Sequence, residues 1–240
     1  MGLSLRLRRA TSSLGGGLMR LTYLGLKGEL IKKGAEAELY KVTFLGLPAI
    51  LKRRVPKPYR ARELDEYIRR TRTAHEVTMM LHARACGVPV PAIYDVDPDE
   101  GVIVMEYIPG PTLRELTSRG VDVKPIFRLV GFYVGRMHRG QVVHGDLTPA
   151  NIVVPEAEKP FFVDFGLSER TGELEALGTD VHLMLRALES THYLKVKELF
   201  NSFLEGYREV MGARAEEVFK KVLEIRRRGR YVEERRAKVR

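Results

Sequence analysis

Residues 144–151 read HGDLTPAN, and residues 164–166 read DFG. The first motif places an acid at Asp146 and an amide five positions later at Asn151, and the second places an acid at Asp164. In enzymes that transfer phosphoryl groups from ATP, the first acid accepts the substrate proton, the amide holds Mg²⁺, and the second acid holds the metal that bridges the phosphates. The spacing therefore predicts ATP-dependent phosphoryl chemistry, with Asp146 catalytic and Mg²⁺ bound by Asn151 and Asp164. A role for Asp146 and Asn151 as simple turn caps is the less specific alternative.

Two short apolar runs separate these motifs, at residues 152–154 and 161–163. Each predicts a buried strand, and the polar residues 155–160 predict the turn between them. Such a hairpin would bring Asn151 and Asp164 together.

Two upstream charges fit the same chemistry. Residues 39–44 and 49–52 predict consecutive strands joined by a turn at Gly46, and Lys52 ends the second strand. A helix is predicted over residues 64–85, and it carries Glu76. In protein kinases a strand lysine clamps the phosphates and a helical glutamate holds that lysine. We therefore predict a catalytic Lys52 supported by Glu76; the alternatives are an exposed strand end and a solvated helix charge.

The expected nucleotide loop is residues 34–37, which read GAEA instead of a glycine-rich loop. Gly34 keeps full backbone freedom, and Ala35 and Ala37 are small enough to let the backbone approach a phosphate. The Glu36 carboxylate would repel a triphosphate, so we expect it to point toward the helix that bears Glu76, or toward a metal or water.

A strand and a hinge are predicted after this helix. Residues 102–108 predict a strand that enters the hinge, and Pro-Gly-Pro at residues 109–111 predicts the break into a second lobe. We expect adenine to hydrogen-bond to the main chain around Glu106 and Ile108.

Several motifs together carry a family resemblance: GAEA at 34–37, Arg-Thr-x-x-Glu at 72–76, residues 87–91, HGDLTPAN, residues 163–168, Ser-Thr-His at 190–192 and an arginine-rich C-terminus. They resemble the small atypical kinase of the KEOPS complex, a family that includes the p53-related protein kinase of eukaryotes and its archaeal counterparts. The resemblance covers residues 30–230. It implies an α+β, minimal two-lobed protein-kinase-like fold, with a small β-rich N-lobe containing one main helix and a helical C-lobe.

The resemblance also implies a function. Family members are atypical Ser/Thr kinases or ATPases that support threonylcarbamoyl modification of adenosine 37 in tRNA, beside a Kae-type threonylcarbamoyltransferase and other KEOPS subunits. Carried over position by position, the functional residues are Lys52, Glu76, Asp146, Asn151, Asp164 and the loop at 34–37.

Three features of the sequence differ from the corresponding features of regulated protein kinases. Gly145 stands where such kinases have an Arg that receives an activating phosphate, Thr148 replaces a lysine, and no Ala-Pro-Glu follows Gly166. We therefore expect no phosphate switch of that kind and poor peptide specificity, and Asp146 is also suited to orienting water. Asp180 is predicted either to anchor the catalytic loop or to be an N-terminal helix charge.

Charge and composition restrict the classes of partner that the protein is expected to bind. The formal net charge is +10, and basic residues concentrate around residues 52–72 and in the C-terminal run 226–240. This run predicts contact with the phosphates of tRNA, with a solvated tail as the alternative. One cysteine excludes an internal disulfide, and no apolar run is long enough to span a bilayer, so we expect a soluble cytoplasmic protein without membrane contact.

The expected organisation has four parts: an uncertain extension at 1–28, the N-lobe at 29–108, the C-lobe at 109–225 and the basic tail at 226–240. The extension is expected to be either an extra strand or an over-extended start before Met19, and residues 21–26 predict an added edge strand. Two other functions stay open: a small-molecule phosphotransferase of the aminoglycoside or sugar type, and a nonenzymatic RNA-binding scaffold.

Overall fold

The computed structural model describes residues 18–20, 23–155, 159–191 and 193–238, and within them the side chains of 23–155, 159–191 and 194–228. The chain divides into two compact units. One contains the residues up to Ala74 together with Ala92–Tyr107, and the other contains His75–Pro91 and the residues from Ile108 onward. Residues 75–91, predicted to lie in the N-lobe, group with the second unit, and the long helix α1 (Arg62–Ala85) contributes to both units.

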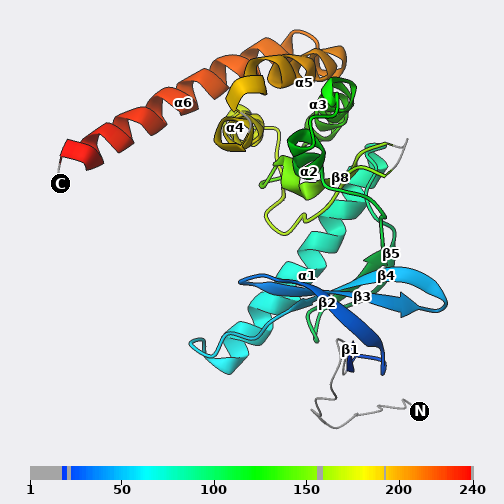
Figure 1. Cartoon of the computed structure of the whole chain (residues 1–240). Helices are drawn as coiled ribbons and strands as arrows, with labels where there is room; N and C mark the ends of the chain where they lie inside the picture. The colour runs from blue at the N-terminus through cyan, green and yellow to red at the C-terminus, as the bar shows by residue number, and fades with distance from the viewer. Residues whose placement is uncertain (1–17, 21–22, 156–158, 192, 239–240) are drawn as a thin grey trace. The chain divides into compact units, whose positions relative to one another are not determined.

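The described part of the first unit is built on a six-stranded antiparallel sheet (Figure 1). Its order is β1 (Leu18–Arg20), β2 (Lys27–Lys33), β3 (Ala37–Phe44), β4 (Leu47–Arg54), β6 (Val102–Glu106) and β5 (Ile93–Asp97). Leu45 and Gly46 form the tight turn between β3 and β4, with φ of 49° and 82°. This left-handed conformation suits glycine and gives the twist of a hairpin. The predicted strands and their turn are confirmed.

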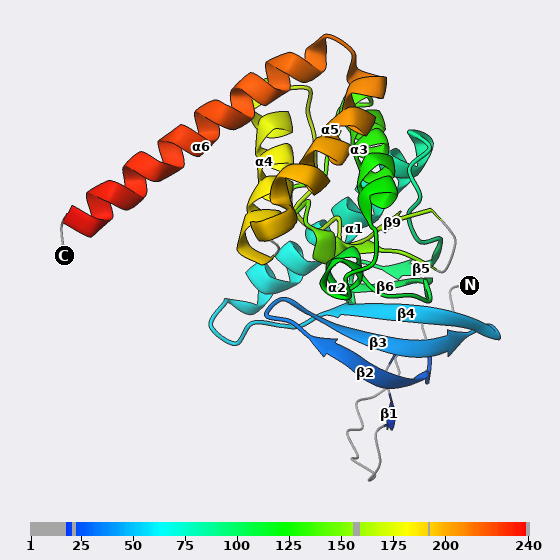
Figure 2. The same cartoon turned by 45° about the horizontal axis from the view of Figure 1, so that its top comes forward.

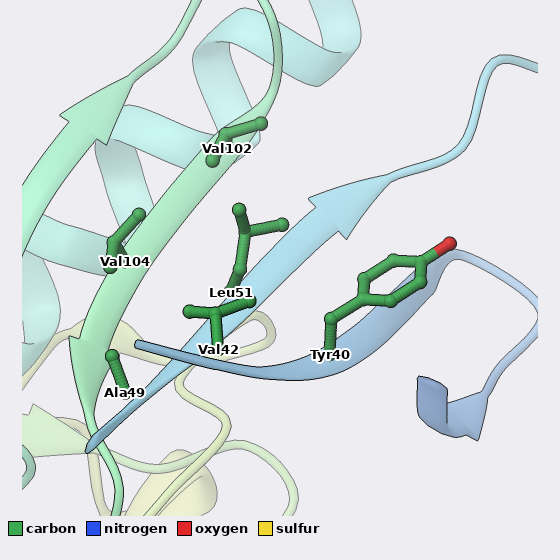
Figure 3. Close-up of a cluster of buried hydrophobic side chains, with 6 residues drawn as sticks. All are labelled: Tyr40, Val42, Ala49, Leu51, Val102 and Val104. Carbon is green, nitrogen blue, oxygen red and sulfur yellow. The ribbon is translucent and has the colours of Figure 1, made fainter. Parts of the chain in front are cut away.

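One face of this sheet carries an apolar core (Figure 3). Its buried members come from β3, β4 and β6: Tyr40, Val42, Ala49, Leu51, Val102 and Val104. Side chains alternate between the faces of a strand, so Lys52 lies on the opposite face of β4 from Leu51.

The N-terminal edge differs from expectation. Residues 23–26 form a turn, in which Leu24 and Gly25 have positive φ and the Leu26 N–H donates to the Tyr23 carbonyl at 3.0 Å. The strand is β1, which pairs with β2. The predicted edge strand at 21–26 is therefore wrong for residues 23–26, while residues 21 and 22 lie outside the described ones.

Helices dominate the second unit: α2 (Leu113–Ser118), α3 (Lys124–Arg139), α4 (Leu174–Thr191), α5 (Val196–Met211) and α6 (Arg214–Lys238), with short 3₁₀ turns η1 (Pro149–Asn151) and η2 (Tyr193–Lys195). Helices α3 and α5 lie side by side (Figures 1 and 2). They meet at two glycines: a Cβ on Gly131 would lie 1.9 Å from the Phe203 carbonyl oxygen, and one on Gly206 would lie 1.8 Å from that of Arg128. No other residue fits at either position without separating the helices.

Two short strand pairs complete this unit. β8 (Ile152–Val153) pairs with β9 (Phe161–Phe162), which confirms the predicted hairpin, and β7 (Val142–Val143) pairs with β10 (Glu169–Arg170). Residues 226–238, expected as a separate tail, continue helix α6. No helix in the described ranges has the length and apolar character needed to cross a membrane.

Candidate active site

A buried carboxylate anchors the catalytic loop, the HGDLTPAN segment at residues 144–151. Asp180, on α4, is fully buried and accepts the main-chain N–H groups of His144 at 2.7 Å and Gly145 at 2.9 Å. Helix α4 begins at Leu174, so Asp180 lies inside the helix and the reading as an N-terminal charge is wrong. Asp180 is therefore the loop anchor.

A buried histidine holds this anchor in turn. Nε2 of His138 lies 3.2 Å from the Asp180 carboxylate, and its Nδ1 lies 2.9 Å from the Tyr207 hydroxyl. Burial alone would raise the pKa of Asp180, but the bonds from His138 and His144 outweigh it, so this pKa lies below its usual value. Burial also raises the pKa of the Tyr207 hydroxyl. Sequence patterns did not indicate this network, because its members come from three helices.

Asp146 and Asn151 are brought together by the loop and the 3₁₀ turn that follows it. The Asn151 amide nitrogen donates to the Asp146 carboxylate at 2.8 Å and to its carbonyl at 3.0 Å. Asn151 is buried and Asp146 is half-buried. The amide orientation directs nitrogen to Asp146 and leaves the amide oxygen to accept a cation.

Asp164 follows strand β9 and is tied to the same loop through its neighbour. The Val163 N–H donates to the Asn151 carbonyl at 3.0 Å, and the Val163 carbonyl accepts Nε2 of His144 at 3.2 Å. Asp164 is exposed, with φ of 65°. For a non-glycine residue this conformation is uncommon and is found at functional sites. The structure thus draws the segments of Asn151 and Asp164 together, as the sequence predicted.

Close packing explains the glycine at position 145. Gly145 has φ of 78°, and a Cβ there would lie 2.0 Å from the Leu167 carbonyl oxygen. An arginine cannot occupy this position without displacing the segment after Asp164. The absence of a phosphate-receiving arginine is therefore built into the backbone.

The remaining predicted residues belong partly to the first unit. The loop at residues 34–37 is closed by the Gly34 N–H, which donates to the Ala37 carbonyl at 2.9 Å. Glu36 pairs with Arg72 on α1 at 2.6 Å and with Arg54 at 3.8 Å, and the bond with Arg72 holds its pKa below the usual value. The expectation that Glu36 points toward the helix bearing Glu76 is confirmed.

Lys52 and Glu76 are both buried, with 8% and 1% of their surfaces exposed. The readings of an exposed strand end and a solvated helix charge are therefore wrong. Lys52 belongs to the first unit and Glu76 to the second, so their pairing stays a prediction.

The hinge residues are also divided between the units. The Glu106 N–H and carboxylate both bond to Ala92, at 2.8 and 3.0 Å, while Ile108 begins the second unit. Contact of either residue with adenine stays a prediction.

The donor set suits magnesium. Mg²⁺ prefers oxygen ligands and is usually held by one or two protein groups together with phosphates. Asn151 and Asp164 supply an amide oxygen and a carboxylate, whereas no cluster of three or more His, Cys, Asp or Glu side chains suited to a metal occurs in the described ranges. The residues present thus fit an ion that arrives with nucleotide.

Comparison with known proteins agrees with this architecture. The family model of the ABC1 atypical kinase-like domain matches residues 57–200, more than half of the chain. The Rio2 kinase of Chaetomium thermophilum, solved as an ADP/Mg²⁺-phosphoaspartate complex, shares the fold with a TM-score of 0.59 at 17% identity, over 82% of this chain and 70% of that one. At this identity the likeness concerns the fold alone.

Two relatives match this chain at higher sequence identity than the Rio2 kinase does. The KEOPS complex subunit Bud32 of Pyrococcus abyssi is 41% identical over 85% of this chain and 97% of its own length. A probable bifunctional tRNA threonylcarbamoyladenosine biosynthesis protein of Methanothermobacter thermautotrophicus is 38% identical over 87% of this chain, which spans 38% of that protein. The chain therefore carries an atypical kinase-like domain and belongs to the family of the KEOPS complex subunit Bud32.

Proposed function

We propose that this protein is an ATP- and Mg²⁺-dependent atypical Ser/Thr kinase or ATPase that acts in the cytoplasm as a KEOPS subunit in the formation of tRNA threonylcarbamoyladenosine. The observation that carries the chemistry is the Asn151 amide, which donates to Asp146 through its nitrogen and so leaves its oxygen to accept a cation. The names of the relatives support the biological role.

Each residue has a distinct task. Asp146 accepts a proton from a hydroxyl or from an attacking water, and Asn151 and Asp164 bind Mg²⁺, which neutralises charge on the phosphates. The motif assigns Lys52 to the phosphates and Glu76 to Lys52. A Ser/Thr substrate and a hydrolytic water both fit the role of Asp146, so the fate of the phosphoryl group must be measured.

The partners are proposed as a Kae-type threonylcarbamoyltransferase and the other KEOPS subunits. Support comes from the Bud32 relative, whose name places it in that complex, and from the bifunctional relatives, of which this chain spans about two fifths. Neither alternative function has comparable support from the relatives.

The experiment measures ATP hydrolysis and transfer of labelled phosphate by the purified protein, alone and with the transferase and tRNA. Asp164→Asn should abolish both, because the metal loses its carboxylate. Glu169→Gln is the matched control: it removes an exposed charge five residues on, in β10, and should leave turnover unchanged.

The outcomes separate the two activities. Hydrolysis that rises with the partner while labelled protein stays constant identifies an ATPase, and label on an added protein identifies a kinase. ATP turnover by Asp164→Asn equal to that of the unchanged protein would refute the proposed site.

A tRNA contact at the C-terminal end of α6 is the second part of the proposal. Arg226 and Arg228 pair with Glu189 and Glu175 on α4, and Arg227 and Arg228 are both exposed. The side chains of 229–240 lie outside the described ones. Because each phosphate contact releases counterions, removing residues 229–240 should weaken tRNA binding and flatten its dependence on salt. An unchanged salt slope would exclude this segment as the contact.

A further inference from the structure

His75 makes a bond that the proposed chemistry does not use. It lies on α1 directly before Glu76, and its Nε2 is 2.7 Å from the main-chain carbonyl oxygen of Ser168. A carbonyl oxygen can only accept, so Nε2 carries the hydrogen. Both residues belong to the second unit, and 93 positions separate them in sequence.

Ser168 closes a turn that begins at Phe165, the residue directly after Asp164. Its N–H and its hydroxyl donate to the Phe165 carbonyl at 3.2 and 2.5 Å, and the residue is almost fully buried. The Phe165 ring in turn lies against His144, with 4.7 Å between the ring centroids. The turn is therefore a compact unit directly after Asp164, and we expect a displacement of Ser168 to displace Asp164 as well.

The same turn touches the catalytic loop. The Leu167 carbonyl oxygen occupies the space in which Gly145 would otherwise carry a Cβ, and Asp146 is the next residue. Displacing the end of the turn would thus disturb both acids of the site.

We propose that His75 is a positioning residue that fixes the middle of α1, and with it Glu76, to the turn that follows Asp164. The inference rests on the proposed function, because it concerns the same site. In kinases controlled by phosphorylation, new arginine–phosphate pairs order the activation segment. Here Gly145 leaves no room for such an arginine, and the hydrogen bond from His75 to the Ser168 carbonyl links the helix to this segment without a phosphate.

A pair of substitutions separates this role from simple stabilisation. His75→Leu removes the donor, whereas His75→Gln keeps an N–H that can reach a carbonyl. His82→Leu is the matched control, because His82 is a half-buried histidine on the same helix α1, seven residues further along. Each variant is assayed for kcat, for the KM of ATP, and for hydrogen exchange of the amides of residues 166–170.

We expect kcat of His75→Leu to fall about three- to tenfold, the effect of one net hydrogen bond, while the KM of ATP changes less than about twofold. Amide exchange in residues 166–170 should accelerate by a similar factor. His75→Gln should restore both quantities, and His82→Leu should match the unchanged protein.

Two results would overturn the inference: His75→Leu indistinguishable from His82→Leu in kcat and in exchange, or His75→Gln as impaired as His75→Leu. The proposed function fails separately, if the unchanged protein turns over no ATP. In that case the exchange rates alone decide whether His75 holds the turn.

Discussion

Asp180→Asn tests the anchor of the catalytic loop. The substitution keeps the shape of the side chain but replaces one carboxylate oxygen by an NH₂ group, which cannot accept a hydrogen bond. Asp180 now accepts two main-chain N–H groups and His138 in a fully buried position. At least one donor would lose its acceptor, and the other bonds would lose the assistance of charge.

The magnitude follows from these bonds. A hydrogen bond to a charged group contributes about 1.5–3 kcal/mol and one between neutral groups about 1 kcal/mol, so the variant should lose about 2–4 kcal/mol of unfolding free energy. Glu175→Gln is the matched control, because Glu175 lies on the same helix but forms only half-exposed ion pairs with Lys221 and Arg228. Such pairs contribute less than about 1 kcal/mol.

The assay is urea unfolding at pH 7, followed by circular dichroism, with ATP turnover measured in parallel. Because the folded-state pKa of Asp180 is lowered, its contribution is complete above the usual value of 3.8 and is lost as the pH falls through the folded pKa. The difference between the two proteins should therefore shrink in acid. A loss within about 1 kcal/mol of that of Glu175→Gln would refute the anchor.

Two further predictions concern packing and charge. Gly131→Ala should lower the free energy of unfolding by about 3 kcal/mol, because its Cβ would overlap the Phe203 carbonyl. Gly172→Ala is the control: its nearest neighbour lies at 3.6 Å, so the loss should be less than about 1 kcal/mol. Thermal unfolding compares the two variants, and equal losses would contradict the packing argument. Glu36→Gln should lower the free energy of unfolding by less than about 1 kcal/mol, because the ion pair of Glu36 with Arg72 is half-exposed. Since the pKa of Glu36 is lowered, this cost should be present above pH 4.5 and vanish as the pH falls through the folded pKa, and urea unfolding across pH checks it.

Local patterns predicted most of the elements. The helix expected at 64–85 begins two residues earlier in α1, and the hairpin between Asn151 and Asp164 forms as β8 and β9. These features depend on residue periodicity and turn chemistry within a few positions, which a single sequence contains.

The missed features depend on contacts between distant residues. Gly131 and Gly206 read as ordinary helical glycines until α3 and α5 are seen to touch through their backbones. The charge of residues 226–238 suggested a tail, but arginine also favours helices, and Val218 and Val222 are buried where α6 packs against α4. In both places tertiary packing, and not the local sequence pattern, determines the structure.

The glycine contact between α3 and α5 has a consequence for biosynthesis. Tyr207, one residue after Gly206, reaches His138 at the end of α3, just before the catalytic loop. The two partners are 69 residues apart, so the loop has its full support only after the ribosome has added α5. A nascent chain that has already exposed Asp146, Asn151 and Asp164 still lacks this brace, and the order of synthesis delays a competent site until the C-terminal helices emerge.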